Sequence, residues 1–554
     1  MAFGTPLDPN TAPPKPAKGG VNPRYGEAVQ MGPPASKAAV LRSVALGYTS
    51  GAEAPQLPPG VSSRGSNFIG VGGGLVPRPG LRSLGTPGSS FTYDPPTWIG
   101  QLDTVVVALG MNPMRAASAI TQWSLLSYFS STYTTGTLFG AMDNGYYSAT
   151  PYYHPTTDRN ELLISNVQGF TGSDTWTYSP SSSSDALAYS TMTRTGATLR
   201  GGYVVYFDDR LVFARDAEVE WSTRGAPETY TTPDGGVELL SNARGGGITG
   251  LFVDGDRLLV LFRDQVWVGY KAPFPFNFQF TLLSGEVGCM APRSAAQTPH
   301  GIVFLGSDYN LWVIPSGGAP KLFSDDVSAL LNEQLTGDWF GRAFANDAAG
   351  GWHDELNAYI LSWMDGNFKA QGLAVRLTGR GVEWNPLSFD VQSANSWHIR
   401  CFGQLSTSTK FNIGNYGRGR LVGASSLRSG STMSTGDLFE FTSLATDDLG
   451  SRISCTRFVI VPNDNPSERQ IVRELRLDYR CDSASSLSVR MTPDFGTTYP
   501  VSVNVALPPA PLSAQTAIHV SISAAYPGIE LRHDSGHTFA LQGLTAIVES
   551  GGNG

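Results

Sequence analysis

Charged side chains are scarce in this sequence. Lys, Arg, Asp and Glu together make up 15% of the 554 residues, whereas an average soluble domain has about 25%. The surface must therefore consist largely of Ser, Thr, Asn and Gly, which lose little when they are buried against another subunit. The formal net charge of -8 argues against a non-specific DNA-binding protein, because such a protein needs a basic face.

Long apolar runs and cysteine pairs are missing as well. No apolar run approaches the roughly 18 residues of a membrane span, and the N-terminal MAFGTPLDPNTAPPKPAKGG lacks the basic region and apolar core of a signal peptide. We therefore expect a protein without a membrane anchor that folds in a cytoplasm. Because no CxxC motif occurs, we expect buried free thiols, although Cys455 and Cys481 could be neighbours. The four cysteines are Cys289, Cys401, Cys455 and Cys481.

Sequence motifs for catalysis are also lacking. The segment GVGGGL at 70–75 lacks the third glycine of a dinucleotide-binding fingerprint, and no GxSxG nucleophile elbow occurs. The segments WHDEL (352–356) and HDSGH (533–537) are typical of turns rather than of a zinc-binding helix. We therefore predict that the chain is not an enzyme and has no cofactor and no metal site.

Proline and glycine, by contrast, are abundant, and they are densest in residues 1–90. Segments such as TAPPKPAKGG and VGGGLVPRPG supply no apolar core. A segment of this kind becomes ordered only where it lies on something else. We therefore predict an extended N-terminal arm over residues 1–90 that lies across neighbouring subunits.

Short β-strands separated by Gly, Asp and Asn turns fill residues 91–445. Three segments share one pattern of strand, turn and strand: YVVYFDDRLVFAR, GLFVDGDRLLVLFRDQVWVGY and GIVFLGSDYNLWVIP. They recur about every 45 to 50 residues, which is the length of a propeller blade. We therefore predict a β-propeller over 91–445. Helical spacing is limited to 112–131 and to 324–335, where Ser324 can cap the helix.

Residues 446–554 alternate apolar and polar side chains with a period of two, which predicts an antiparallel β-sandwich. The segment TPDFGTTY at 492–499 approximates an Asp-box, a hairpin in which Asp494 binds backbone N–H groups and Gly496 takes a positive φ. The predicted fold class is thus all-β: a β-propeller with a C-terminal antiparallel β-sandwich and an extended N-terminal arm.

The order of the propeller segments resembles that in the β-propeller tail proteins of bacteriophages. YFDDRLVFA (206–214) is followed by VEWSTRGAPETYT (219–231), by a hairpin at 245–268, by a segment ending in LGSDYNLWVI, and by LFSDDVSALLN (322–332). Equivalent segments occur in the same order in the nozzle, or tail tubular protein B-like, and hub proteins of short-tailed phages. The resemblance covers roughly residues 160–390 and implies a structural virion protein of the tail.

The resemblance also implies partners and a location. The chain would form a ring of copies, commonly six, that continues the DNA channel below the portal and adaptor, and it would contact tail-fibre or tail-tip proteins. It would be assembled in the bacterial cytoplasm and end in the virion tail. Genomic DNA would pass without sequence-specific binding, because an acidic wall weakly repels phosphates. The candidate channel-facing turn acids are Asp208, Asp209, Asp254 and Asp256.

Two other functions fit the same composition. One is a tail adhesin that binds the host surface, and the other is a propeller glycosidase or depolymerase. The enzyme would need paired carboxylates that face a cleft, or an Arg cluster with a Tyr nucleophile. The spacing of the carboxylates in the sequence singles out no such pair.

Overall fold

The structure is a computed structural model, and within the part of the chain that it describes it is all-β apart from one short helix and short 3-10 turns. The residues described are 29–30, 36–41, 62, 64–71, 74–84, 96–102, 105–109, 114–117, 123–125, 127–128, 146–167, 175–178, 186–189, 193–194, 197–198, 201–240, 246–336, 345–365, 369–378, 381–389, 395–406, 419–429, 432–442, 445–448, 451–463, 469–534, 536 and 538–551.

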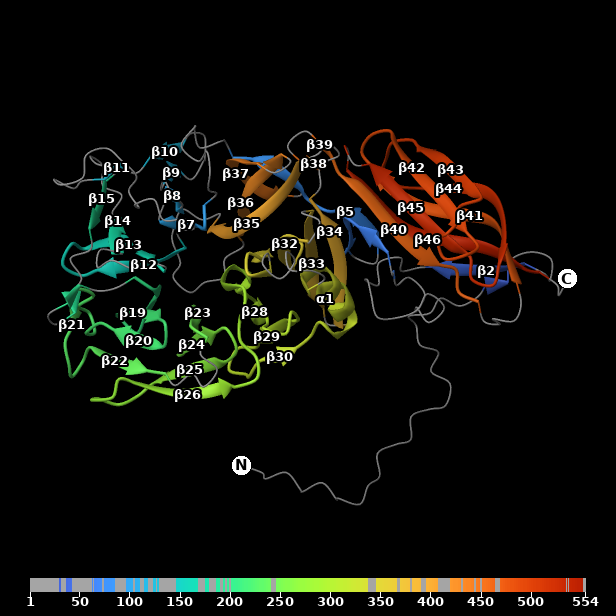
Figure 1. Cartoon of the computed structure of the whole chain (residues 1–554). Coiled ribbons are helices and arrows are strands. Elements are labelled where there is room, and N and C mark those ends of the chain that lie inside the picture. The colour runs from blue at the N-terminus through green and yellow to red at the C-terminus, as the bar shows by residue number, and fades with distance from the viewer. Residues whose placement is uncertain are drawn as a thin grey trace, which may run out of the picture.

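Seven antiparallel sheets in these residues surround an axis as the blades of a propeller (Figure 1). The first strand of a blade lies next to the first strand of a neighbouring blade. For example, β12 (Tyr147–His154) contacts β18 (Tyr203–Phe207), and β35 (Asn395–Ser406) of the last blade contacts β7 (Trp98–Leu102) of the first. The ring is therefore closed, and the predicted all-β propeller is confirmed.

The blades follow one another along the chain. Blade one contains β7, β8 (Val105–Leu109), β9 (Met114–Ala117) and β10 (Trp123–Leu125), and blade two contains β12, β13 (Arg159–Asn166), β14 (Thr175–Tyr178), β15 (Ala186–Tyr189) and the short β11 (Ser127–Tyr128). Blade three contains β18, β19 (Arg210–Arg215), β20 (Glu218–Trp221) and β22 (Gly236–Leu239), and a small sheet of β16 (Thr193–Arg194), β17 (Ala197–Thr198) and β21 (Thr229–Tyr230) accompanies it.

The later blades have the same design. Blade four contains β23 (Ile248–Asp254), β24 (Arg257–Phe262), β25 (Val266–Lys271) and β26 (Phe278–Ser284), and blade five contains β27 (Ala296–Thr298), β28 (Gly301–Leu305), β29 (Leu311–Ile314) and β30 (Lys321–Leu322). Blade six contains β31 (Ala349–His353), β32 (Ala358–Met364), β33 (Ala370–Thr378) and β34 (Gly381–Ser388), and blade seven contains β35, β36 (Gly419–Ser429), β37 (Thr432–Thr442), β6 (Gly80–Ser83), β38 (Asp447–Asp448) and β39 (Ser451–Arg452).

Two of the hairpins that recur in the sequence, β18–β19 and β23–β24, are the first two strands of their blades, and the third, β28–β29, is the second and third strand of blade five. In blade four, every residue of β24 is buried, because neighbouring blades cover both faces of the sheet. The turn before β24 contains Gly255 at φ 63, and the turn before β19 contains Asp208 at φ 54 and Asp209 at φ 56. Gly, Asp and Asn tolerate this left-handed conformation, which two-residue hairpins require.

A strand from the N-terminal part of the chain completes the last blade. Strand β6 pairs antiparallel with β37, so residues far apart in the sequence share one sheet. The buried Arg78 lies just before β6 and binds Asp448 with Nη1 at 2.9 Å. Its guanidinium also donates to Asn67 Oδ1 at 3.0 Å and lies 4.9 Å from the ring centre of Phe389. These contacts attach the N-terminal segment to the propeller.

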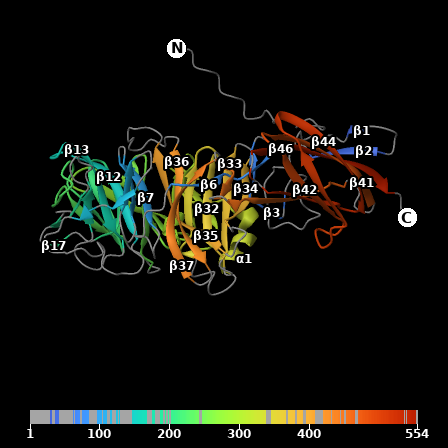
Figure 2. The same ribbon diagram turned by 90° about the horizontal axis from the view of Figure 1, so that it is seen from above.

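The C-terminal residues form the predicted β-sandwich, which lies beside the propeller (Figure 2). Apolar residues from two sheets, including Val459, Leu475 and Leu531, make up its core. One sheet contains β3 (Gly65–Ser66), β40 (Ser454–Ile460), β45 (Gly528–Asp534), β42 (Ser485–Thr492) and β43 (Val501–Leu507). The other contains β1 (Val29–Gln30), β2 (Ser36–Leu41), β46 (Phe539–Gly551), β41 (Arg469–Cys481), β44 (Ala510–Ala524), β4 (Phe68–Val71) and β5 (Gly74–Pro77).

The Asp-box forms the hairpin that the sequence predicts. Asp494 Oδ1 accepts hydrogen bonds from the backbone N–H groups of Thr497 at 3.1 Å and Thr498 at 2.8 Å. Gly496 has a φ of 94. Hydrogen bonds from Thr492 and Thr498 lower the pKa of Asp494 to about 2. This carboxylate is therefore a structural element of the turn.

The N-terminal part of the chain differs from an arm that lies only on other subunits. Strand β2 pairs antiparallel with β46 of the same chain, and β3 to β6 belong to the sandwich and to the last blade. The rest of the predicted arm, including residues 1–28 and 42–61, lies outside the described residues. The structure thus places several short strands of the arm in sheets of its own chain.

One of the two predicted helices is wrong. Within 112–131 the chain forms β9, β10 and β11, because β9 pairs with β8 and this sheet pairing overrides the helical spacing. The other helix is confirmed as a 3-10 turn (Asp325–Val327) followed by α1 (Ser328–Thr336). Ser324 does not cap it, since the Ser324 hydroxyl accepts from the N–H of Leu311 at 2.9 Å.

Candidate functional site

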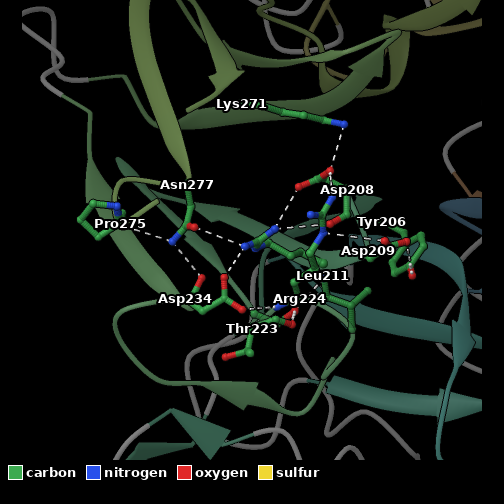
Figure 3. Close-up of polar contacts among 12 residues, drawn as sticks. Tyr206, Asp208, Asp209, Leu211, Thr223, Arg224, Asp234, Lys271, Pro275 and Asn277 are labelled. Atoms are coloured by element: carbon green, nitrogen blue, oxygen red, sulfur yellow. Dashed lines mark hydrogen bonds and ion pairs between the residues drawn. The ribbon is translucent and has the colours of Figure 1, made fainter. Parts of the chain in front are cut away.

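The turn acids predicted from the sequence lie at or just after the ends of first strands. Asp208 forms ion pairs there with arginine and lysine side chains. Asp208 contacts Arg210 at 2.9 Å, Arg224 at 2.6 Å and Lys271 at 2.9 Å (Figure 3). Arg210 also binds Asp234, which belongs to the same blade. Because three carboxylates, with Asp209 included, face three cations, we call this group the turn cluster. It comprises Asp208, Asp209, Asp234, Arg210, Arg224 and Lys271.

Of the second predicted pair, Asp254 and Asp256, the first forms an ion pair with an arginine, as Asp208 does. Asp254 is buried and accepts from Arg257 Nε at 2.7 Å and from the Ser316 hydroxyl at 2.7 Å in the next blade. Burial alone would raise its pKa, but the bonds from Ser316 and Arg257 outweigh burial, and the pKa of Asp254 is lowered. Asp256 is exposed. These contacts join neighbouring blades, and the channel-facing role of the four acids stays a prediction.

A different polar cluster lies on the axis of the propeller. Tyr146 directly precedes β12 in blade two, and Arg400 lies within β35 in blade seven. Arg293 lies in the 3-10 turn Pro292–Ser294, three residues before the first residue of β27 in blade five, and Asp347 lies two residues before the first residue of β31 in blade six. Blades two and five are on opposite sides of a seven-bladed ring, so their side chains meet only near the axis. We call these four residues the central cluster.

Hydrogen bonds connect the central cluster. Arg293 Nη2 donates to the Tyr146 phenol oxygen at 2.7 Å and to Asp347 Oδ1 at 2.9 Å. The Tyr146 hydroxyl in turn donates to Asp347 Oδ1 at 3.4 Å. Arg293 Nη1 donates to the backbone carbonyl of Arg400 at 3.0 Å, and Arg400 Nη2 lies 3.6 Å from Asp347 Oδ1. The phenol is therefore held between a guanidinium and a carboxylate.

The charged side chains of the central cluster are largely, but not completely, buried. The exposed fraction of the side chain is 8% for Arg293, 10% for Arg400 and 27% for Asp347. Burial alone would lower the pKa of Arg293, but the Tyr146 phenol and the Asp347 carboxylate outweigh it, and this pKa is raised. The guanidinium therefore stays charged, and the Asp347 side chain is more exposed than that of either arginine.

Two buried thiols lie near the central cluster, and neither is a nucleophile. Burial raises the pKa of Cys289 to about 12 and that of Cys401 to about 12. A thiol with such a pKa stays protonated at neutral pH, and the thiolate is the reactive form. All four cysteines are free and buried, as the sequence predicts. The group in this cluster that can be activated for attack is thus the Tyr146 phenol.

The sequence did not single out the central cluster. Its members are separated by up to about 250 residues, and they come together only because first strands of a propeller share one axis. The signal that could have found them is position: Tyr146, Arg293 and Asp347 each lie one to three residues before the first residue of a first strand.

Among the described residues, no three His, Cys, Asp or Glu side chains gather where they would hold a metal ion. No helix in the described part of the chain is both long enough and apolar enough to span a bilayer.

Comparisons with known proteins give structural neighbours only. No family model and no curated protein matches the chain. An exo-β-1,3-galactanase from Phanerochaete chrysosporium is 10% identical, with a TM-score of 0.28 over 85% of this chain and 99% of that one. A glycoside hydrolase family 43 arabinoxylan arabinofuranohydrolase from Bacillus subtilis is 8% identical, with a TM-score of 0.22 over the same shares. Tailspike protein 4 of bacteriophage CBA120 is 12% identical, with a TM-score of 0.14 over 28% of this chain and 19% of that one.

These comparisons contradict the function predicted from the sequence. The two glycoside hydrolases above match over most of the chain, and this finding goes against the predictions of a structural tail ring and of a chain without enzymatic activity, which are not kept. The physical reason is that strand order and turn pattern define a propeller, and propellers host many functions. At such TM-scores no residue of this chain can be matched to a residue of those enzymes. The resemblance to phage tail proteins, the partners and the virion location are not tested and stay predictions.

Proposed function

We propose that this chain is a glycoside hydrolase whose reaction takes place at the central cluster. Tyr146 is the nucleophile, and Asp347 is the base and acid that serves it. The observation that carries the proposal is the placement of the Tyr146 phenol between Arg293 Nη2 and Asp347 Oδ1 on the propeller axis. A hydroxyl becomes a nucleophile when a neighbouring base accepts its proton and a cation stabilises the resulting anion.

The proposed reaction has two steps. In the first, Asp347 accepts the phenol proton while the Tyr146 oxygen forms a bond to the anomeric carbon of the sugar. The bond between that carbon and the leaving oxygen breaks, and a water on the opposite face of the sugar gives its proton to the leaving oxygen. In the second, the hydroxide left from that water attacks the anomeric carbon. The Tyr146 oxygen then leaves and takes its proton back from Asp347.

The guanidinium groups support both steps. Arg293 donates to the phenol oxygen, so negative charge that develops there is stabilised by a fixed, partly desolvated donor. Arg293 also donates to Asp347 Oδ1 and keeps this carboxylate beside the phenol. Because the cluster contains one carboxylate, a phenol takes the place of the second carboxylate that most glycosidases use.

The test compares two tyrosines of the same segment. Tyr146→Phe removes the phenol oxygen of the central cluster, whereas Tyr153→Phe changes an exposed tyrosine near the far end of β12. Release of reducing ends is measured on a panel of neutral and acidic polysaccharides. We expect Tyr146→Phe to lower kcat/KM at least about 10³-fold and Tyr153→Phe to leave it unchanged. If the folded wild-type protein releases no reducing ends from any member of the panel, the proposal is rejected.

A further inference from the structure

We propose that two copies of this chain bind each other through the sandwich, by an antiparallel pairing of strand β44 with its own copy about a two-fold axis beside Ala517. Strand β44 belongs to the sandwich, whereas the central cluster belongs to the propeller, so the pairing is independent of the proposed reaction.

Strand β44 is an edge of its sheet in the described part of the chain. It pairs with β41 on one side, and the order of strands in that sheet ends with it. The backbone N–H and C=O groups that point away from β41 therefore meet no other strand among the described residues. With 15 residues, β44 is also long, since strands usually have about 5 to 6. A long free edge is a template on which another strand can pair.

The apolar core of the sandwich is incompletely covered along this edge. Ala514 and Val520 of β44 pack against the core but are only partly buried. The same holds for Val501 and Val503 of β43, a strand that contacts β44. Leu512, which shares one side of β44 with Ala514, is 86% exposed. A strand added to β44 would cover this apolar border and would be stabilised by its burial.

Charged side chains, which usually protect a free edge against pairing, are missing here. Residues 501–524 contain no Lys, Arg, Asp or Glu, although such residues make up 15% of the whole chain. His519 is the only ionisable side chain in this range, and no proline interrupts residues 512–524. An approaching strand would therefore strip no water from a carboxylate or an ammonium group and would meet no like charge.

The sequence of β44 matches itself in an antiparallel register. Ala517 is the midpoint of the strand and would lie opposite Ala517 of the second copy. Ala514 would then lie opposite Val520 on the side of the core, so that two partly buried apolar groups cover each other. On the outer side, Gln515 would lie opposite His519, and polar groups would meet polar groups. Because the register of β44 against β41 is regular from Ala514 to His519, this middle part can continue the ladder.

A second copy of the chain is the partner that these features favour. Each copy offers the same edge, so one antiparallel pair uses both edges and the assembly ends at two chains. Since the edge has no charged group, it also loses little when a second surface of the same kind covers it. The 15 residues per copy are fewer than the roughly 20 to 30 of a standard interface, so we expect a dissociation constant of about 1 to 100 µM.

Sedimentation velocity of the full-length protein, from about 0.5 to about 200 µM, measures the pairing, and we expect a monomer–dimer equilibrium. Ala517→Lys places two like charges opposite each other at the axis and should raise the dissociation constant at least about tenfold. Ala484→Lys changes an exposed alanine in the turn between β41 and β42. It is the matched control and should leave the dissociation constant unchanged. Urea unfolding checks that both variants are folded.

Cysteine cross-linking then tests the register. Opposite residues of an antiparallel pair have Cα atoms about 4.5 to 5.5 Å apart, which a disulfide can span. Ala517→Cys alone should therefore form a linked dimer on oxidation. Gln515→Cys and His519→Cys should link only when the two variants are mixed, because identical positions would lie about four residues, or roughly 13 Å, apart. The native cysteines are buried, so the wild-type chain is the control that forms no link.

Two results would overturn the proposal. One is a wild-type chain that stays monomeric at about 200 µM, which would mean that β44 is left free or is covered by a different partner. The other is an assembly whose size Ala517→Lys does not change and in which Ala517→Cys forms no cross-link, because the contact between copies would then lie elsewhere. If Ala517→Lys failed to fold, the cross-linking of Ala517→Cys alone would decide.

Discussion

The turn cluster and the central cluster contain similar residues and lie toward opposite ends of the first strands. They differ in how carboxylates and cations are matched. Asp208 in the turn cluster meets Arg210, Arg224 and Lys271, so each carboxylate there has a cation close by. In the central cluster, one carboxylate, that of Asp347, is shared by two guanidiniums and a phenol. The first arrangement is balanced in charge and stabilises the contact between blades. The second brings a phenol, a guanidinium and a carboxylate into contact near the axis, which is the combination that the proposed reaction uses.

Acidic residues visible in a sequence mark turns more readily than reactive sites. Asp208 directly follows a first strand and Asp254 ends one, where hairpin geometry favours Asp. Tyr146, Arg293 and Asp347 lie shortly before first strands instead, and no local pattern marks them. Changing one cluster at a time, with the other as a reference, therefore separates their roles.

The largest effect is expected in the central cluster. Asp347→Asn keeps the size of the side chain but removes the base, so kcat/KM should fall about 10²- to 10⁴-fold on the best substrate found. The measurement is initial-rate kinetics on the purified variant. Asp234→Asn in the turn cluster is the reference and should leave kcat/KM within about twofold. A similar fall in both variants would show that the loss comes from the fold and not from the site.

The second effect is on stability and belongs to the turn cluster. Arg210→Met removes a guanidinium that is 5% exposed and leaves Asp208 and Asp234 without it. We expect the free energy of unfolding to fall by about 2 to 3 kcal/mol, because breaking a buried pair leaves an uncompensated charge. Urea unfolding of the propeller is the measurement. Arg215→Met on the same strand, whose partner Asp216 is 83% exposed, should cost less than about 1 kcal/mol.

The third effect is a change in how the stability of the folded protein depends on pH. The folded-state pKa of Asp254 is lowered, so its contribution to stability is present above the ordinary carboxyl pKa and is lost as the pH falls through the folded value. The wild-type protein should therefore lose stability below about pH 4 partly through this group. Asp254→Asn should flatten the decline measured between pH 6 and pH 3. An unchanged slope would mean that other carboxylates account for the acid sensitivity.

The smallest effect is expected at Asp209. Its side chain is 66% exposed and lies 3.8 Å from Arg224, so the pair contributes little. Asn also tolerates the positive φ of this turn. Asp209→Asn should therefore change the free energy of unfolding by less than about 0.5 kcal/mol. A larger loss would show that the turn cluster depends on every one of its charges.

The sequence predicts the propeller and the sandwich because their signals are local. Turn residues such as Asp208 and Gly255 have the φ values that the hairpins need, and the period-two pattern of 485–492 matches the alternate burial of that strand. The helical spacing over 112–131 misled the prediction, since pairing with β8 outweighed it. Tyr146 and Arg293 could not be paired from sequence, because their contact depends on the closure of the whole ring.

The closure of the last blade sets the order in which this chain can finish folding. Strand Gly80–Ser83 leaves the ribosome early, but its partner Thr432–Thr442 follows only after roughly 350 further residues, which takes about 20 to 70 seconds at 5 to 20 residues per second. During that time β6 has no partner strand in its blade, and the ring of blades is not yet closed. The ring therefore closes last, and the central cluster, which needs residues from blades two, five, six and seven, is complete only once blade seven has been made.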